Sequence, residues 1–377
     1  MRWRTMAALL AAIPTGPAAA QTADSAAFVI RLGSDTVAVE RYVRTADRLV
    51  VDAVQRSPST MIHRFVYSTG PEGRITAGEW TVRRPGGGEP VMRREIRLGA
   101  DSATLTTTDA NGNRSQQVAV RDAIPMGGPF YTPYELAMMR AVASGTPKAE
   151  VAMLAGSNVV TIPVERVGRD SVALQNQFGE PMRAHVDERG RLLHLHTPAF
   201  TTVERTAWID LDALAADFAR RDESSQGLGM LSPRHAARTR VGDANIWLDY
   251  SRPAMRGRPI WGALVPWDAV WRMGANEAAH LATDRTIALG DLTLEPGTYT
   301  LFLLPAADRW TLIVNRATGI SGLERDPAQD IGRVELTTET LERPVELFTV
   351  QVDGAAADAR LAIAWDRTRA SVPLRAR

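Results

Sequence analysis

The sequence predicts a mostly β protein. We expect an N-terminal antiparallel open barrel or half-barrel with one inserted helix, followed by a jelly-roll-like β-sandwich. Residues alternate between apolar and polar with a period of two, and Gly, Asn and Asp turns separate the alternating runs. One stretch in the first half has a helix signature, and the last part of the chain shows strand-like segments without a convincing helix.

The first predicted domain covers residues 21–205. Glycine- and asparagine-rich turns at 86–88 and 111–113 punctuate its strands, as antiparallel hairpins require. The predicted strands span 28–32, 36–43, 49–54, 79–82, 91–98, 103–107, 116–120, 151–154, 159–164, 171–175, 181–186 and 192–196.

The inserted helix is expected over residues 136–143. Thr132 is its predicted N-cap, Pro133 fits the first turn, and Glu135 fits a capping box.

A second helix and a linker are predicted over residues 206–231. Leu211, Leu214 and Phe218 form one apolar stripe within 210–221. The polar and glycine residues of 222–229 then indicate a linker, since they cannot build a core.

The second predicted domain covers residues 232–377. Its many short strands and the missing helix pattern favour a β-sandwich of jelly-roll type. The predicted strands span 244–250, 279–281, 286–289, 297–304, 310–315, 334–337, 345–352 and 360–365.

The N-terminus resembles a secretory signal peptide over residues 1–20. Arg2 and Arg4 precede an apolar run, and small residues end it at Ala20. We therefore expect export to the periplasm or the extracellular space. No other apolar run approaches the length of about 18 residues that predicts a membrane-spanning helix.

Composition excludes several functions. The sequence has no Cys, so disulfides and thiol chemistry are excluded, and Lys148 is its only Lys. Removal of residues 1–20 with Arg2 and Arg4 would change the formal net charge from +1 to −1. A chain with this charge has no electrostatic attraction to nucleic acid, so we predict no nucleic-acid partner. Neither a nucleophile elbow nor a phosphate-binding glycine loop occurs, and we predict no cofactor.

Residues 250–277 combine arginines, tryptophans, prolines and small residues at high density. The segment includes Tyr-Ser-Arg-Pro at 250–253, Ile-Trp-Gly at 260–262 and Trp-Arg-Met-Gly-Ala-Asn-Glu at 271–277. It closely resembles the signature of the DUF2911 family, secreted bacterial proteins without an assigned activity. The resemblance extends over about Ser232 to Val372 and departs at 319–328, where the loop is shortened or altered. It leaves the N-terminal half unrecognised.

Polar side chains of this segment are the first candidates for a ligand site: Arg252, Arg258, Arg272, Asn276 and Glu277. Guanidinium groups bind carboxylates, phosphates or sugar hydroxyls, and a glutamate can serve as acid or base. The alternative is structural, with Arg–Glu pairs and an asparagine turn pinning a long loop.

The tryptophans are the second group of candidates, because sugar faces stack on exposed rings. Trp261 and Trp271 belong to the dense segment. Trp247 lies on the opposite face of its strand from Ile246 and Leu248, which makes it the best candidate for an exposed ring. The alternative is that these rings fill the core.

His194 and His196 share one face of a predicted strand. Such a pair chelates a transition metal when a third ligand converges, and otherwise simply faces solvent. We regard the metal as the weaker interpretation.

Three functions remain open at this point. We favour non-catalytic binding of a small polar ligand, a saccharide or an anion, by the β-sandwich. The first alternative is a hydrolase or lyase with Glu277 as general acid or base, working with Asp249 or Glu346. The second is a carrier of an apolar ligand held between the N-terminal strands and their helix.

Overall fold

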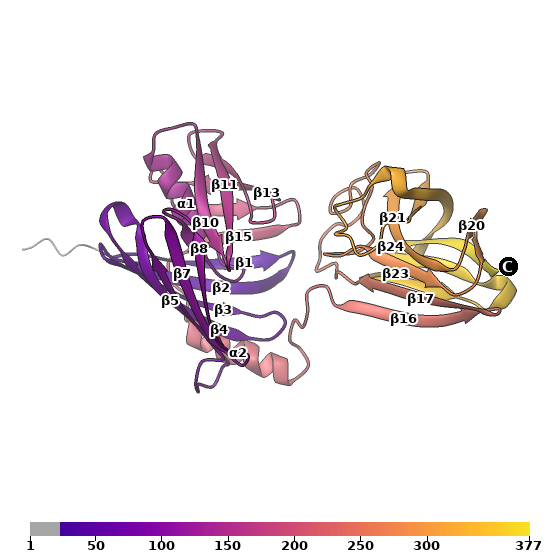
Figure 1. Cartoon of the computed structure of the whole chain (residues 1–377), viewed down its shortest axis with the longest axis horizontal. Coiled ribbons are helices and arrows are strands. Elements are labelled where there is room, and N and C mark those ends of the chain that lie inside the picture. The colour runs from indigo at the N-terminus through magenta and orange to yellow at the C-terminus, as the bar shows by residue number, and fades with distance from the viewer. Residues whose placement is uncertain (1–22) are drawn as a thin grey trace, which may run out of the picture.

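The computed structural model describes residues 23–377 and contains two large β-sheets, each with its own hydrophobic core. Figure 1 shows the two sheets side by side along the long axis of the molecule. The predicted fold class is confirmed: the protein is mostly β, and neither sheet closes into a barrel. The predicted signal peptide lies outside the described residues. Within them, no helix is long and apolar enough to cross a membrane.

The first sheet is an antiparallel meander that curls into a half-barrel. Its strand order is β8-β7-β6-β5-β4-β3-β2-β1-β15-β14-β13-β12-β11-β10-β9, and only the β9–β10 pair is parallel. The strands are β1 Asp24–Leu32, β2 Asp35–Arg44, β3 Arg48–Gln55, β4 Met61–Thr69, β5 Ile75–Arg83, β6 Met92–Leu98, β7 Ser102–Asp109, β8 Gly112–Ala119, β9 Ile124–Met126, β10 Lys148–Ala155, β11 Asn158–Arg166, β12 Ser171–Gln175, β13 Pro181–Val186, β14 Leu192–His196 and β15 Thr201–Thr206.

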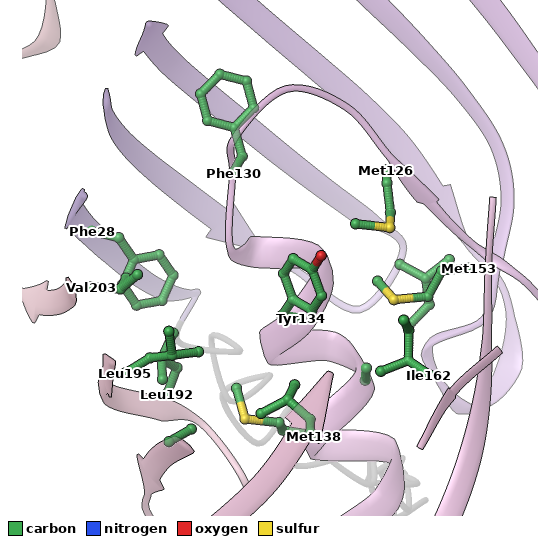
Figure 2. Close-up of a cluster of buried hydrophobic side chains, with 14 of the residues drawn as sticks. Phe28, Met126, Phe130, Tyr134, Met138, Met153, Ile162, Leu192, Leu195 and Val203 are labelled. Carbon is green, nitrogen blue, oxygen red and sulfur yellow. The ribbon is translucent and has the colours of Figure 1, made fainter. Parts of the chain in front are cut away.

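Helix α1 (Thr132–Ala143) lies inside the curl of this sheet. Tyr134 and Met138 point from the helix into a cluster with Met153, Leu195 and other strand residues (Figure 2). Among the described residues, the hollow between α1 and strands β2 to β4 measures ≈ 10 Å³, too little for an apolar cargo. A second hollow of ≈ 220 Å³ lies between α1 and strands β2 to β5, and Leu49, Ile75, Leu136 and Met139 contribute to its lining. The hypothesis of an apolar-ligand carrier therefore stays a prediction.

The start of α1 corrects the sequence prediction. Tyr131, not Thr132, is the N-cap, and it makes no side-chain capping bond. The carboxylate of Glu40 on β2 caps the helix instead, accepting from the backbone N–H of Tyr131 (2.5 Å) and of Thr132 (3.1 Å). Glu135 does not form a capping box, because Arg205 and Arg44 of the strands engage it.

Helix α2 (Leu211–Glu223) packs on the opposite, convex face of the first sheet. Leu211 and Phe218 are buried there against Val39 and Val54, which confirms the predicted stripe. Asp210 is the N-cap and accepts from the backbone N–H of Ala213 at 3.0 Å.

The second sheet folds over on itself into a β-sandwich. Its order is β16-β17-β18-β21-β22-β23-β24-β19-β20, and β17 also contacts β23 across the fold. The strands are β16 Arg234–Val241, β17 Ala244–Ser251, β18 Ala279–Thr283, β19 Ile287–Leu289, β20 Leu292–Leu294, β21 Gly297–Pro305, β22 Trp310–Asn315, β23 Asp330–Asp353 and β24 Arg360–Ala376. Short 3₁₀ turns occur at Pro71–Gly73, Pro327–Gln329 and Ala356–Asp358.

Candidate functional site

Residues 250–277, the segment rich in arginine and tryptophan, include the end of β17 and form the irregular connection from β17 to β18, at the junction of the two sheets. Isolated bridges pin it to the sandwich: Ala254 pairs with Leu347, Trp271 with Leu303, and Glu277 with Ser321. A long connection held this firmly can place side chains at fixed positions without regular secondary structure.

The same connection docks onto the β1–β2 turn of the first sheet. The carbonyl of Arg256 accepts from Ser34 N (2.8 Å), and its guanidinium pairs with Asp35 at 2.5 Å. Gly33 makes this approach possible. It has a φ of +60°, and a Cβ there would lie 2.2 Å from the Arg256 carbonyl oxygen.

A cavity of ≈ 380 Å³ lies beside this contact, between the sheets. Its wall is mostly apolar, and both sheets contribute to it. The lining residues are Leu32, Glu180, Pro181, Thr197, Pro198, Ala199, Leu231, Ser232, Pro253, Arg258, Ala263, Leu264, Pro266, Val270, Trp271, Arg272, Gly274, Ala275, Gly322, Leu323 and Trp365. The volume suits a small organic ligand.

Arg272 is the unpaired cation of this wall. It is half-buried, and within residues 23–377 it makes no hydrogen bond or ion pair. Burial lowers the pKa of Arg272, and the charge of Glu180 from the first sheet opposes that shift. Gly322 leaves room for the arginine stem, since a Cβ there would meet it at 2.5 Å.

The other two candidate arginines act structurally. Arg258 is buried, and it donates to the carbonyls of Met255 (2.9 Å), Ala254 (2.5 Å) and Ala199 (3.2 Å), the last across the junction. Arg252 donates to Phe348 O (3.2 Å) and Thr349 Oγ1 (3.0 Å) on β23, away from the cavity. Their guanidinium groups hold the connection in place.

Asn276 and Glu277 do not line the cavity with Arg272, although all three were candidates for one ligand site. Both are exposed, and Asn276 has a φ of +63°, the left-handed turn conformation that asparagine tolerates. The Glu277 side chain is 73% exposed and lies 3.7 Å from Arg234. Arg234 also binds Asp249 at 2.7 Å, so the two carboxylates share one surface cation.

Trp271 and Trp261 belong to an aromatic cluster at the end of the sandwich core. Trp271 stacks on Trp365 at 5.6 Å, and Trp261 meets Trp310 edge-on at 4.4 Å. Trp271 also lines the cavity, so the cluster forms part of its floor.

Trp247 lies on the outer face of β17, as the alternation predicts, but it is half-buried. The guanidinium of Arg238 covers its ring at 5.1 Å from the centroid. It does not line the cavity.

His194 and His196 share a face of β14, with their ring centroids 6.2 Å apart. Among the described residues, no group of three or more His, Cys, Asp or Glu side chains is arranged to hold a metal ion.

Sequence reasoning missed the contributions of the first sheet to this cavity. Glu180 and Pro198 come from two separate turns and Leu32 from the end of β1, and no local pattern could indicate that they border one cavity with Arg272. The departure of residues 319–328 from the family pattern could point only to the loop after β22, whose Gly322 and Leu323 border the cavity from the second sheet.

Comparison with known protein families gives a match for the sandwich that carries this connection. Residues 232–374 match the family described as "Protein of unknown function (DUF2911)". The resemblance drawn from the sequence is thus confirmed, and no family matches the N-terminal half. A solved β-barrel-like protein of domain of unknown function DUF1849 from Brucella abortus is 10% identical, with a TM-score of 0.33 over 49% of this chain and 96% of that chain. No curated protein matched.

Proposed function

We propose that the protein binds a small molecule with an anionic group and an apolar body in the cavity between its sheets. The observation that carries the proposal is the unpaired guanidinium of Arg272 in a mostly apolar wall. A carboxylate or phosphate would take up its free donors as charge-assisted hydrogen bonds. The apolar body would contact Trp271, Leu264 and Leu323.

The lining favours an organic anion over a saccharide. A sugar needs several hydrogen-bonding side chains around its hydroxyls. The polar lining side chains are few: Glu180, Thr197, Ser232, Arg258 and Arg272, of which Arg258 already binds carbonyls. Leu323 is 72% exposed and Val270 42% exposed at the cavity, and a ligand would cover part of this apolar surface.

Binding without catalysis is the function that we favour. The proposed acid or base, Glu277, is solvated and lies outside the cavity, so nothing in its surroundings singles it out for proton transfer. The signal-like sequence of residues 1–20 supports a place of action outside the cytoplasm, which we propose as periplasmic or extracellular.

The test compares Arg272→Gln with the unchanged protein by isothermal titration. The probes are hexanoate and benzoate, their neutral amides, inorganic phosphate, and glucose for the saccharide alternative. We expect a carboxylate to bind, its amide to bind at least tenfold more weakly, and Arg272→Gln to lose at least tenfold in affinity, or about 1.4 kcal/mol.

The stability of the variant separates ligand binding from scaffolding. Because Arg272 has no partner to lose, we expect Arg272→Gln to change the free energy of unfolding by less than about 0.5 kcal/mol. Arg333→Gln, at an exposed arginine of β23 that is 3.7 Å from Asp330, is the matched control. A variant that loses stability but binds every probe as before would make Arg272 a structural residue.

A further inference from the structure

A second group of side chains with binding potential lies on the concave face of the half-barrel, on strands β3 to β7. Val51, Phe65, Trp80, Arg94 and Thr107 are consecutive cross-strand neighbours from β3 to β7. The first positions of this row are apolar or aromatic, and a cation then occupies an inward-facing position. Such a charge on the concave face of a sheet needs a partner or a function.

Neighbouring side chains fix the Trp80 ring in place. Its Nε1 donates to His63 Nδ1 at 3.2 Å, and Phe65 stacks on it at 5.1 Å. His63 is 5% exposed, and burial lowers its pKa to about 4, so the ring stays neutral and its Nδ1 remains an acceptor near neutral pH. A ring held in this way offers a ligand a preformed aromatic contact.

Arg94 lies against this ring with most of its donors free. Its guanidinium carbon is 5.4 Å from the Trp80 centroid, and its Nε donates to Thr107 Oγ1 at 2.9 Å. Its terminal nitrogens have no hydrogen-bond or ion-pair partner among the described residues. The nearby Asp109 is occupied by a forked contact with Arg114.

Trp80 and Arg94 line a cleft of ≈ 530 Å³ that opens between the two arms of the curled sheet. Met126, Gly127 and Gly128 border it before α1, and the β12–β13 turn brings Phe178, which is 77% exposed. The lining contains no acidic residue, and Arg94 is its only charged one. A Cβ at Gly127 would meet Phe65 at 2.8 Å and Trp80 at 3.0 Å, so glycine there lets the loop approach the rings closely.

We propose that this cleft is a second binding site, selective for an aromatic acid whose ring packs against Trp80 and whose anionic group binds Arg94. The site shares no lining residue with the cavity between the sheets, although the β12–β13 turn borders both. Its single cation and its rigid aromatic ring select both features of the ligand together.

Photo-crosslinking with benzophenone-4-carboxylate tests this proposal on the full chain. The probe inserts into nearby C–H bonds, and the labelled residues are then located by mass spectrometry. We expect labels on residues 126–128, 155–160 or 177–178. We expect at least fivefold less label there in Arg94→Gln and in Trp80→Leu, and also with the neutral carboxamide probe. Arg94→Lys keeps the charge and should retain most of the labelling.

Arg93→Gln is the matched control. Arg93 is the preceding residue on β6, faces outward, and has an exposed contact with Glu79 at 3.7 Å. Labelling of the cavity between the sheets, at residues 253–275, should not respond to Arg94→Gln, so the two sites are read separately. Equal labelling of the cleft in Arg94→Gln and Arg93→Gln, equal labelling by acid and amide, or label found only outside the cleft would each overturn the proposal.

Discussion

Glu40 is a carboxylate with no exposed surface, and it caps a helix from a neighbouring strand. Burial raises its pKa to about 7, although hydrogen bonds from Tyr131 and Thr132 oppose the shift and the charge of Glu135 adds to it. Between pH 4.5 and about 7 the folded chain therefore holds a proton that the unfolded chain releases. The contribution of Glu40 to stability is full below pH 4.5 and is lost as the pH rises through 7.

We expect Glu40→Gln to remove this pH dependence. The amide oxygen can still accept from Tyr131 and Thr132, and the amide nitrogen can donate to the Thr132 hydroxyl. At pH 5 the variant should be within about 1 kcal/mol of the unchanged protein, and at pH 8 it should be more stable than at pH 5 relative to that protein, by on the order of 3 kcal/mol at most. Urea unfolding at pH 5, 6, 7 and 8 measures the difference.

The contribution of His63 to stability changes with pH in the opposite direction to that of Glu40. The effect of Glu40 is therefore measured as the difference in stability between Glu40→Gln and the unchanged protein. The pKa of His63 is lowered to about 4, and its contribution to stability rises with pH between about 4 and 6.5. This contribution is common to both proteins and cancels. Glu188→Gln, at a side chain that is 93% exposed, is the control. If the stability difference between Glu40→Gln and the unchanged protein is the same at every pH, Glu40 does not titrate in this window.

At the level of elements, Glu135 ties helix α1 to the strands around it. Its carboxylate has no exposed surface and binds Arg205 Nη1 (2.7 Å), Arg44 Nη2 (3.4 Å) and the backbone N–H of Leu192 (2.8 Å). Arg205 also donates to the Tyr42 hydroxyl at 2.8 Å. One side chain therefore connects α1 with β2, β14 and β15.

We expect Glu135→Ala to lower the free energy of unfolding by about 3 kcal/mol, because it removes the buried anion of two partly buried guanidinium groups. Arg44 and Arg205 then keep their ion pairs with Asp24, at 3.4 Å and 3.9 Å. Equilibrium urea unfolding measures this loss. Glu95→Ala, which breaks an exposed 3.6 Å pair with Arg97, should cost at most about 0.5 kcal/mol. Similar losses in the two variants would show that the buried contacts of Glu135 add little stability.

Helices and strands could be predicted from the sequence wherever the pattern that indicates them lies within the element itself. Period-two alternation located most strands, and the stripe of α2 located that helix. The N-cap of α1 was not predictable, because Glu40 lies 91 residues from Tyr131. Strand β16 was missed because its Ala, His and Arg residues carry little β preference, and its pairing with β17 determines it. Strand β23 reads as two segments, yet the polar residues 338–340 continue it by pairing with β24.

At the scale of the whole molecule, the candidate site depends on how the two sheets meet. The sequence located the segment that faces the first sheet and named Arg272 and Trp271 within it. It could not show that the Arg258 guanidinium donates its hydrogen bonds to backbone carbonyls. One of these carbonyls, that of Ala199, belongs to the first sheet. Nor could it show that Glu277 faces solvent. Each outcome follows from contacts between residues far apart in the chain.

The junction itself rests on the close approach at Gly33, so we expect Gly33→Ala to weaken it. The added methyl would lie 2.2 Å from Arg256 O and 2.8 Å from Arg258 Cγ, displacing the connection that carries Arg272. Because each sheet has its own core, both should remain folded while their contact loosens. Small-angle scattering should show a larger radius of gyration, protease should cut residues 224–233 faster, and binding that depends on Arg272 should weaken. Gly86→Ala carries the same backbone penalty of about 1 kcal/mol at a φ of +88°, with no atom within 4 Å, and should change none of these. If the two variants behave alike, the approach at Gly33 does not hold the sheets together, and the cavity between them must be maintained by other contacts.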